Sequence, residues 1–217
     1  MRMRFKPYAR EELQKNELIY YNPVEQKGKW REEFNNKNPI HLEIGAGFGK
    51  FAISIAERTS NINYVAMEKE ERVFVNAARD FKEANLSNLL GIRDDAENLD
   101  KFFGEDEIEK IYINFPNPWP KRNQHKRRLT HPRLLEIYKR FLKEGGEIEF
   151  KTDQKGFFED SIKYFERNDF ILEEIIYNLG IDEKEDNIVT EYEAKWREKG
   201  DEIYYLKAKL KKKGKWN

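Results

Sequence analysis

Residues 43–50, EIGAGFGK, combine an acidic side chain with three glycines, a pattern that suits ligand binding by the main chain. Glycine tolerates positive φ and lets a ligand approach the backbone closely. The segment lies where a short apolar run passes into a helical pattern, and open α/β sheets bind ligands in such loops. We therefore interpret Gly45, Gly47 and Gly49 as a ligand-binding turn; the simpler alternative is a tight turn without a ligand.

The spelling of this turn separates three classes of ligand. A P-loop needs four residues between its first glycine and Gly-Lys, and here Gly45 and Gly49 enclose only three, with Phe51 after the lysine. A dinucleotide fingerprint needs glycine at the position of Lys50. GxGxG after an acidic residue is instead typical of sites for S-adenosylmethionine. That cofactor carries an ammonium and a sulfonium, for which Glu43 is a suitable electrostatic partner.

Two further acidic residues follow later strands. Glu68 closes the second predicted strand, nineteen residues after Gly49, where a carboxylate can accept both ribose hydroxyls. Its alternative is a solvated charge at a strand end. Asp95 follows the third strand and suits the adenine amino group, although Asp94 could take its place. The alternative for Asp95 is a cap for a helix that begins near Glu97.

Residues 114–120, NFPNPWP, form a stiff turn after the fourth predicted strand. Its three prolines fix φ and reduce the entropy lost on ordering. In a sheet of this kind the loop faces the methyl donor. Trp119 offers a flat face on which a base can stack, and Asn117 offers an amide donor and acceptor. The alternative is a rigid surface turn with a packed tryptophan.

A basic run follows the turn although the chain has 41 basic and 41 acidic residues and no net charge. Its members are Lys121, Arg122, His125, Lys126, Arg127, Arg128, His131 and Arg133. No acidic residue occurs between 114 and 135, and a run of one sign in a neutral protein is typical of phosphate binding. We predict a nucleic acid partner. His125 and His131 have no acidic neighbour in sequence, so we interpret them as RNA-contacting or simply polar.

Alternating strands and helices must position these residues. Strands are predicted at 41–45, 63–69, 88–92, 110–115, 147–152, 170–179 and 201–210. Helices are predicted near 10–19, 48–56, 73–84, 134–142 and 155–167, with one more starting at the capping box of Thr190. This order indicates an α/β fold with a mostly parallel sheet. The alternation of Glu147, Glu149 and Lys151 does not suit a strand buried on both faces.

The length of 217 residues suits one domain, which we place at 39–217 behind an N-terminal arm at 1–38. The absence of cysteine excludes disulfides and thiolate metal sites, and no metal is expected. No signal-peptide or membrane-spanning stretch is found, so we expect a cytoplasmic protein with no membrane partner. Monomer and homodimer both remain open.

With these motifs in order, the chain resembles the bacterial tRNA (guanine-N7-)-methyltransferases nearly from end to end. The resemblance is carried by RMRFKPYA, EIGAGFGKF, NFPNPWPKRNQHKRRLTHPRLL, FKTD and TEYEAKW. The third stretch is the most specific. The resemblance implies a class I methyltransferase fold, Rossmann-like, with seven strands, one of them antiparallel, and helices on both faces. It also implies transfer of a methyl group from S-adenosyl-L-methionine to guanine 46 in the variable loop of tRNA.

The resemblance assigns roles to individual residues. The cofactor would contact Glu43, Gly45, Gly47, Gly49, Glu68, Asp95 and Asn117. The target nucleotide would contact Lys121, Asp153, Thr190, Glu191, Tyr192 and Glu193. The tRNA backbone would meet Asn123, Gln124, His125, Lys126, Arg127 and Arg128.

Asn117 departs from the family pattern, because many members carry an aspartate there that is often treated as catalytic. Guanine N7 already has an in-plane lone pair and needs no deprotonation before it attacks a methyl group. The enzyme mainly has to hold N7 in line with the S–CH₃ bond. An amide can accept a hydrogen bond but cannot balance the charge that grows on the purine. We keep Asn117 as the expected catalytic residue and expect activity to survive.

Three other functions explain the sequence less completely. An amino-group methyltransferase normally spells its turn Asn-Pro-Pro-aromatic, whereas here Pro120 follows Trp119. A non-catalytic RNA-binding protein would not need Glu43, Glu68 and the glycine turn. A nicotinamide oxidoreductase fails on Lys50 and leaves the basic run unexplained.

Overall fold

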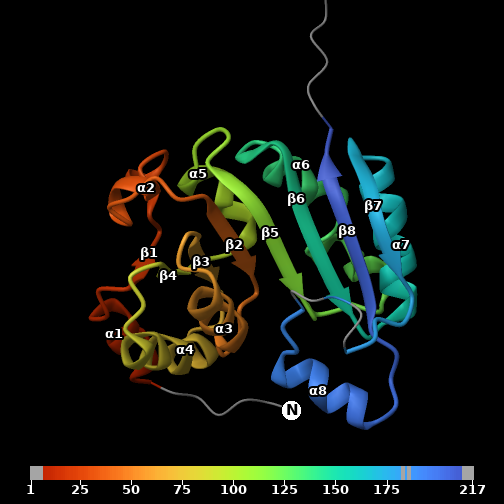
Figure 1. Ribbon diagram of the computed structural model, residues 1–217, viewed down its shortest axis with the longest axis horizontal. Helices are drawn as coiled ribbons and strands as arrows, with labels where there is room; N and C mark the ends of the chain where they lie inside the picture. Colours follow the sequence, from red (N-terminus) through yellow and green to blue (C-terminus); the bar gives the residue numbers. More distant parts are fainter. Residues whose placement is uncertain (1–6, 182–183, 185–186, 212–217) are drawn as a thin grey trace, which may run out of the picture.

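The computed structural model describes residues 7–181, 184 and 187–211, and within them eight strands form one sheet (Figure 1). The strands are β1 (Ile19–Tyr21), β2 (Ile40–Ile44), β3 (Asn63–Met67), β4 (Leu89–Arg93), β5 (Ile108–Asn114), β6 (Leu142–Thr152), β7 (Phe170–Ile176) and β8 (Tyr204–Leu210). Their order is β1-β4-β3-β2-β5-β6-β8-β7, and β8 runs antiparallel to both neighbours. The predicted fold class is confirmed. The strand count is eight because β1, from the predicted arm, pairs with β4.

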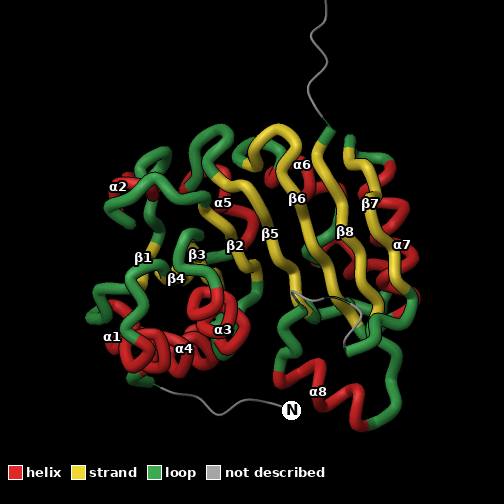
Figure 2. Tube along the Cα trace, in the orientation of Figure 1, coloured by secondary structure: helices red, strands yellow, loops and turns green. Residues whose placement is uncertain are grey.

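Helices lie on both faces of the sheet (Figure 2). They are α1 (Ala9–Gln14), α2 (Trp30–Glu33), α3 (Lys50–Arg58), α4 (Glu71–Ala84), α5 (Leu99–Phe102), α6 (Pro132–Tyr138), α7 (Lys155–Glu166) and α8 (Glu191–Glu198). Residues of α1, α3 and α4 share one apolar core with one face, and residues of α2, α5, α6 and α7 share a larger core with the other. The apolar stripes read from the sequence account for these two cores.

The described part of residues 1–38 is built into the domain. Trp30 is fully buried, and its indole Nε1 donates a hydrogen bond to the Phe102 carbonyl at 2.9 Å. The Glu107 carboxylate accepts from the Trp30 backbone N–H at 3.0 Å and from the Gly28 N–H at 2.9 Å. Residues 1–6, where most of the RMRFKPYA motif lies, are outside the described residues.

One face of β5, β6, β8 and β7 explains the charged alternation in β6. In Figure 1, α6 and α7 lie behind these strands, and α8 lies near the lower end of their front side. On that side α3 also reaches β5, where Phe51 contacts Tyr112. Lys110 Nζ lies 2.6 Å from Glu149 and 3.5 Å from Glu147. Lys207 Nζ lies 3.3 Å from both Glu147 and Glu173. The alternating charges therefore pair across strands on the part of this face that the helices leave open.

The predicted helix at 134–142 was wrong at its end. The helix α6 ends at Tyr138, and β6 begins at Leu142 and runs through the glycine pair. A Cβ on Gly146 would lie 2.9 Å from the Glu109 carbonyl oxygen of the neighbouring strand. Gly146 therefore allows β6 to lie close to β5, next to a register shift in β5. It does not end the helix.

Candidate active site

The glycine turn joins β2 to α3 at the carboxyl end of the sheet. Gly47 and Gly49 have φ of 58° and 74°, in the left-handed region that favours glycine. A Cβ on Gly49 would lie 2.6 Å from the Phe81 ring, so this glycine lets α3 pack against α4. A Cβ on Gly47 would have no neighbour within 4 Å, so its outer side faces open space. The turn is therefore packed at one glycine and accessible at another.

A cavity of about 550 Å³ lies between this turn and the ends of β3, β4 and β5. Its lining includes Gly45, Glu68, Lys69, Asp95, Glu97, Phe115, Asn117, Trp119, Arg127 and Arg133. The structure thus brings together the glycine turn, both later acidic residues and the Pro-Trp turn, as the order of strands predicted.

The acidic residue after β3 is held by backbone amides. Glu68 Oε2 accepts a hydrogen bond from the Gly47 N–H at 3.0 Å. Its Oε1 accepts from the Lys69 and Glu70 N–H groups at 2.8 and 2.9 Å. These contacts fix the carboxylate at the cavity wall beside the glycine turn.

The two aspartates after β4 have different surroundings. Asp94 Oδ1 accepts from the Asn98 side chain at 2.7 Å, and Asp94 is not among the residues that line the cavity. Asp95 lines it, and its Oδ1 also accepts from the Glu97 N–H at 3.2 Å. Asp95 therefore caps the following turn and also faces the cavity. The predicted cap and the predicted contact with the adenine amino group do not exclude each other.

A second cavity, of about 200 Å³, adjoins the first through Gly45 and Phe115. Glu43 lines it and is 5% exposed. Its Oε1 accepts from Asn114 Nδ2 at 3.1 Å, whereas its Oε2 is buried without a hydrogen-bond partner. Burial raises the pKa of Glu43 to about 7, although Asn114 and Lys151 act to lower it. An unpaired buried carboxylate oxygen is costly, so it marks a place for a donor or cation.

The Pro-Trp turn overhangs the first cavity in a strained conformation. Phe115 and Trp119 have φ of 47° and 42°, which non-glycine residues seldom adopt. Asn117 is exposed, and its Oδ1 accepts from the Trp119 N–H at 3.1 Å, which caps the turn. The Arg127 guanidinium lies 4.9 Å from the centre of the Trp119 ring, so one face of that ring is already covered.

Most of the expected RNA-binding residues lie on a short 3₁₀ helix, η3 (Arg122–Arg127). Asn123, Lys126 and Arg127 are exposed, and Gln124 and His125 are half-buried. Lys121 is exposed and lines neither cavity. The exposed cations are therefore available to a phosphate backbone.

Arg128 corrects the expectation of a contact with the tRNA backbone. It is 4% exposed. Its Nε donates to the Pro118 carbonyl at 2.8 Å, its Nη1 to Asp160 at 2.7 Å, and its Nη2 lies 3.0 Å from His125 Nε2. The guanidinium is thus used inside the protein, where it ties the Pro-Trp turn to α7. Sequence reasoning missed this because Asp160 lies 32 residues away.

The TEYE segment (190–193) also contains both residues that line a cavity and a residue that is buried among internal partners. Thr190 caps α8, as its spacing predicted, and its Oγ1 accepts from the Glu193 N–H at 3.0 Å. Thr190 and Tyr192 line the second cavity. Glu193 is fully buried and paired with Lys151 and Arg197, which corrects the expectation that it contacts substrate. The Glu191 side chain is not among those described.

Asp153 is half-buried at the end of β6 and lies near Tyr192. Burial and the charge of Asp153 together raise the pKa of Tyr192. Two expected substrate residues, one directly after β6 and one on α8, therefore interact electrostatically although 39 positions separate them in the chain.

Glu97 and Arg133 line the first cavity, although the sequence did not predict them there. Arg133 Nη2 donates to Glu97 Oε1 at 2.8 Å and to the Lys126 carbonyl at 3.1 Å. The pair therefore connects the wall near Asp95 to η3. The signal in the sequence was only that Arg133 ends the basic run.

Comparison with solved structures shows which proteins share this fold. The aminoglycoside resistance methyltransferase NpmB1 matches with a TM-score of 0.62 and 15% identity, over 84% of this chain and 92% of that one. A SAM dependent methyltransferase from Aquifex aeolicus matches with a TM-score of 0.58 and 11% identity, over 95% of this chain and 100% of that one. The fold is therefore that of a methyltransferase.

Sequence comparison is more specific. The profile of the family described as "Putative methyltransferase" matches residues 37–206. The tRNA (guanine-N(7)-)-methyltransferase of Clostridium tetani is 47% identical over 97% of this chain and 100% of the relative. That of Desulfitobacterium hafniense strain DCB-2 is 43% identical over 94% of this chain and 96% of the relative. The chain belongs to the tRNA (guanine-N(7)-)-methyltransferase family.

Proposed function

We propose that this protein transfers a methyl group from S-adenosylmethionine to N7 of a guanine in tRNA, the guanine at position 46 of the variable loop. The observation that carries the proposal is the pair of adjoining cavities. One holds a buried carboxylate oxygen without a partner, and the other is overhung by the Pro-Trp turn with exposed cations beside it. The family membership supports the same reaction.

The residues present fit the cofactor. The buried Oε2 of Glu43 suits its ammonium, and the outer side of Gly47 leaves room for its chain. Glu68 and Asp95, on the wall of the larger cavity, suit the ribose hydroxyls and the adenine amino group. When bound, the cofactor supplies an electrophilic methyl group on sulfur.

The protein's part in the reaction is to position the base. Guanine N7 carries its own lone pair, so no side chain has to remove a proton before attack. Asn117 lines the larger cavity, and Thr190 and Tyr192 line the smaller one. These side chains would orient the base, together with Asp153, whose charge acts on Tyr192. Lys121 lies outside both cavities and would meet the nucleotide only when RNA is bound.

The exposed part of the basic run would hold the tRNA backbone. Asn123, Gln124, His125, Lys126 and Arg127 remain in this role, and Arg128 is left out because it is buried. Phosphate contacts fix register without reading sequence, so they suit a protein that presents one loop of a folded RNA to its active site. A cytoplasmic location follows from such a substrate. Among the described helices none is long and apolar enough to cross a bilayer.

The proposal is tested by incubating the protein with labelled S-adenosylmethionine and unmodified tRNA. Borohydride and aniline cleave the chain at N7-methylguanosine, and we expect one cleavage, at position 46. Label on another base would favour the amino-group methyltransferase, and the absence of transfer together with tight tRNA binding would favour a non-catalytic RNA-binding protein.

A further inference from the structure

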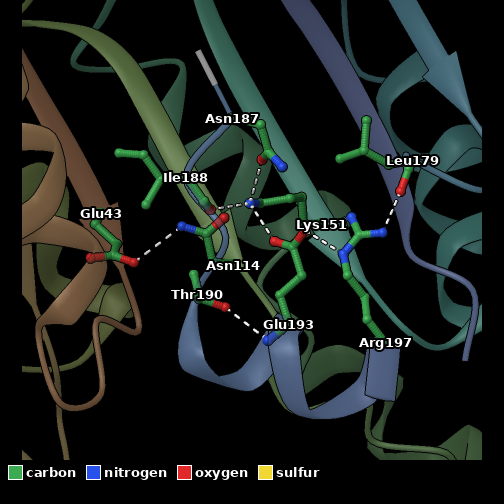
Figure 3. Close-up of polar contacts among 9 residues, drawn as sticks. All are labelled: Glu43, Asn114, Lys151, Leu179, Asn187, Ile188, Thr190, Glu193 and Arg197. Atoms are coloured by element: carbon green, nitrogen blue, oxygen red, sulfur yellow. Dashed lines mark hydrogen bonds and ion pairs between the residues drawn. The ribbon is translucent and has the colours of Figure 1, made fainter. Parts of the chain in front are cut away.

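Lys151, near the carboxyl end of β6, is a buried cation with a complete set of partners. It is 4% exposed. Its Nζ donates to Asn187 Oδ1 at 3.1 Å, to the Ile188 carbonyl at 3.0 Å and to Glu193 Oε2 at 2.9 Å. An ammonium has three donors, so all of them are satisfied. All three acceptors belong to residues 187–198, which we call the strap (Figure 3).

Glu193 is the centre of the strap's attachment. It is fully buried, and its Oε1 accepts from Arg197 Nε at 3.0 Å and Nη2 at 2.6 Å. Arg197 Nη1 also donates to the Leu179 carbonyl at 2.6 Å. Burial acts to raise the pKa of Glu193, but Lys151 and Arg197 hold it below its ordinary value. The carboxylate is therefore charged at neutral pH and joins β6 to the strap.

The strap forms a wall of the smaller cavity. Thr190 and Tyr192 line that cavity opposite the glycine turn and Glu43. The Tyr192 ring centre lies 5.1 Å from that of Phe115, which is part of the Pro-Trp turn. The strap is thus in contact with the turn that overhangs the larger cavity, and a shift of the strap would open the cavity around Glu43.

A buried ion pair is seldom retained for stability alone, because desolvation offsets much of the attraction. Its value here is geometric. Asn114, the β5 neighbour of Lys151 in register, donates to Glu43. One row of side chains across the sheet therefore holds both the carboxylate on one side of the smaller cavity and the strap on the other (Figure 3).

We propose that Lys151 is a positioning residue that, by binding Glu193, holds the strap against the methionine end of the cofactor site. This inference rests on the proposed function for the identity of the ligand, but the attachment of the strap can be tested without it.

The attachment is tested by hydrogen–deuterium exchange of the free protein. In Lys151→Met, amides of the strap should exchange at least about tenfold faster than in the wild type, because local opening of the strap costs less. Glu193→Gln should give the same pattern and serves if Lys151→Met does not fold. The control is Lys207→Met. Lys207 lies on the neighbouring strand β8 and pairs with Glu147 and Glu173, so this variant also removes a paired cation from the sheet. Unchanged exchange of the strap in Lys151→Met, or equal acceleration in Lys207→Met, would overturn the inference.

The link to the ligand is tested by calorimetry with S-adenosylhomocysteine as the probe. Tyr192→Ala should weaken binding in the wild-type background and have little further effect in Lys151→Met, because Lys151 no longer holds the strap at the cavity. Additive losses would contradict a positioning role and indicate general destabilisation. If the wild type does not bind the probe at all, the proposed function fails, and the exchange result still decides whether Lys151 holds the strap.

Discussion

At the scale of single residues, Asn117 places an amide where the resembled family often has a carboxylate. Its oxygen caps the turn by accepting from the Trp119 N–H, a contact that a carboxylate makes equally well. The turn geometry should therefore survive the exchange. The difference is limited to charge near the purine.

We predict that Asn117→Asp changes kcat by no more than about tenfold, or about 1.4 kcal/mol. The reason is that N7 needs no deprotonation, so the side chain contributes position and a modest electrostatic effect. Steady-state kinetics with saturating tRNA measure this. A gain of roughly a thousandfold, about 4 kcal/mol, would show that the amide disables the site.

Glu43 is predicted to make cofactor binding depend on pH. Because burial raises its pKa to about 7, the side chain is neutral below that pH and must lose a proton to bind an ammonium. Affinity for S-adenosylmethionine should therefore fall by up to about tenfold per pH unit as pH drops from 7 to 5.5. Calorimetry across this range measures it. Glu43→Gln should bind at least about tenfold more weakly at pH 7.5 and show no such slope.

The same group sets a stability trend of defined sign. A carboxyl whose pKa is raised from 4.5 to about 7 on folding favours the folded state below pH 4.5, and this contribution is lost as pH rises through 7. Glu43→Gln should thus match the wild type in thermal midpoint near pH 4 and exceed it at pH 8. An equal difference at both pH values would mean that the carboxyl titrates normally.

At the scale of elements, Arg128 connects the Pro-Trp turn, η3 and α7. We predict that Arg128→Lys lowers kcat/KM for tRNA by at least about tenfold, because a lysine cannot donate to Pro118, Asp160 and His125 at once. Stability should fall by about 1–3 kcal/mol. Affinity for S-adenosylmethionine, measured separately, should change less than about twofold, because no Arg128 contact reaches Glu43 or Glu68.

Arg122→Lys is the matched control, since Arg122 is exposed on the same segment. An equal loss in both variants would mean that Arg128, like Arg122, acts through guanidinium contacts with the RNA and not by holding the Pro-Trp turn.

The elements also show how far sequence reasoning reaches. Apolar runs located β2, β3, β4 and β5, because burial on both faces leaves a local pattern. Alternation of apolar and polar residues located β8, because one of its faces is less buried. The glycine turn, Glu43 and Glu68 were predictable for the same reason, since their positions relative to strand ends are local. The helix end predicted at Gly145-Gly146 was wrong, because the sequence does not distinguish a glycine that ends a helix from one that allows close contact between strands.

Pairings between distant segments were not predictable. Arg128 with Asp160 and Lys151 with Glu193 join residues 32 and 42 positions apart, and each removes a charged residue from the surface. Nothing local distinguishes a buried arginine from the exposed ones beside it. Strand β1 was not predicted, because it has only three residues and is stabilised by pairing with β4.

At the scale of the whole molecule, a neutral chain presents a local basic surface to a polyanion. We predict that Lys126→Gln lowers the dependence of log Kobs on log salt by about 0.7–0.9, the value for one lost phosphate contact. Lys207→Gln, on the open face of the sheet, should leave the slope unchanged. Titrations of tRNA binding at several salt concentrations measure both. An unchanged slope in Lys126→Gln would place the RNA on another surface.

Transfer of the methyl group to N7 of one guanine is tested most directly with two tRNA transcripts, carrying guanosine or 7-deazaguanosine at position 46. The second transcript has a C–H group in place of N7. With labelled S-adenosylmethionine, we expect transfer to the guanosine transcript and a loss of at least about a hundredfold, or about 2.7 kcal/mol, for the other. Equal transfer to both transcripts would contradict the account, because the acceptor would then be a different atom.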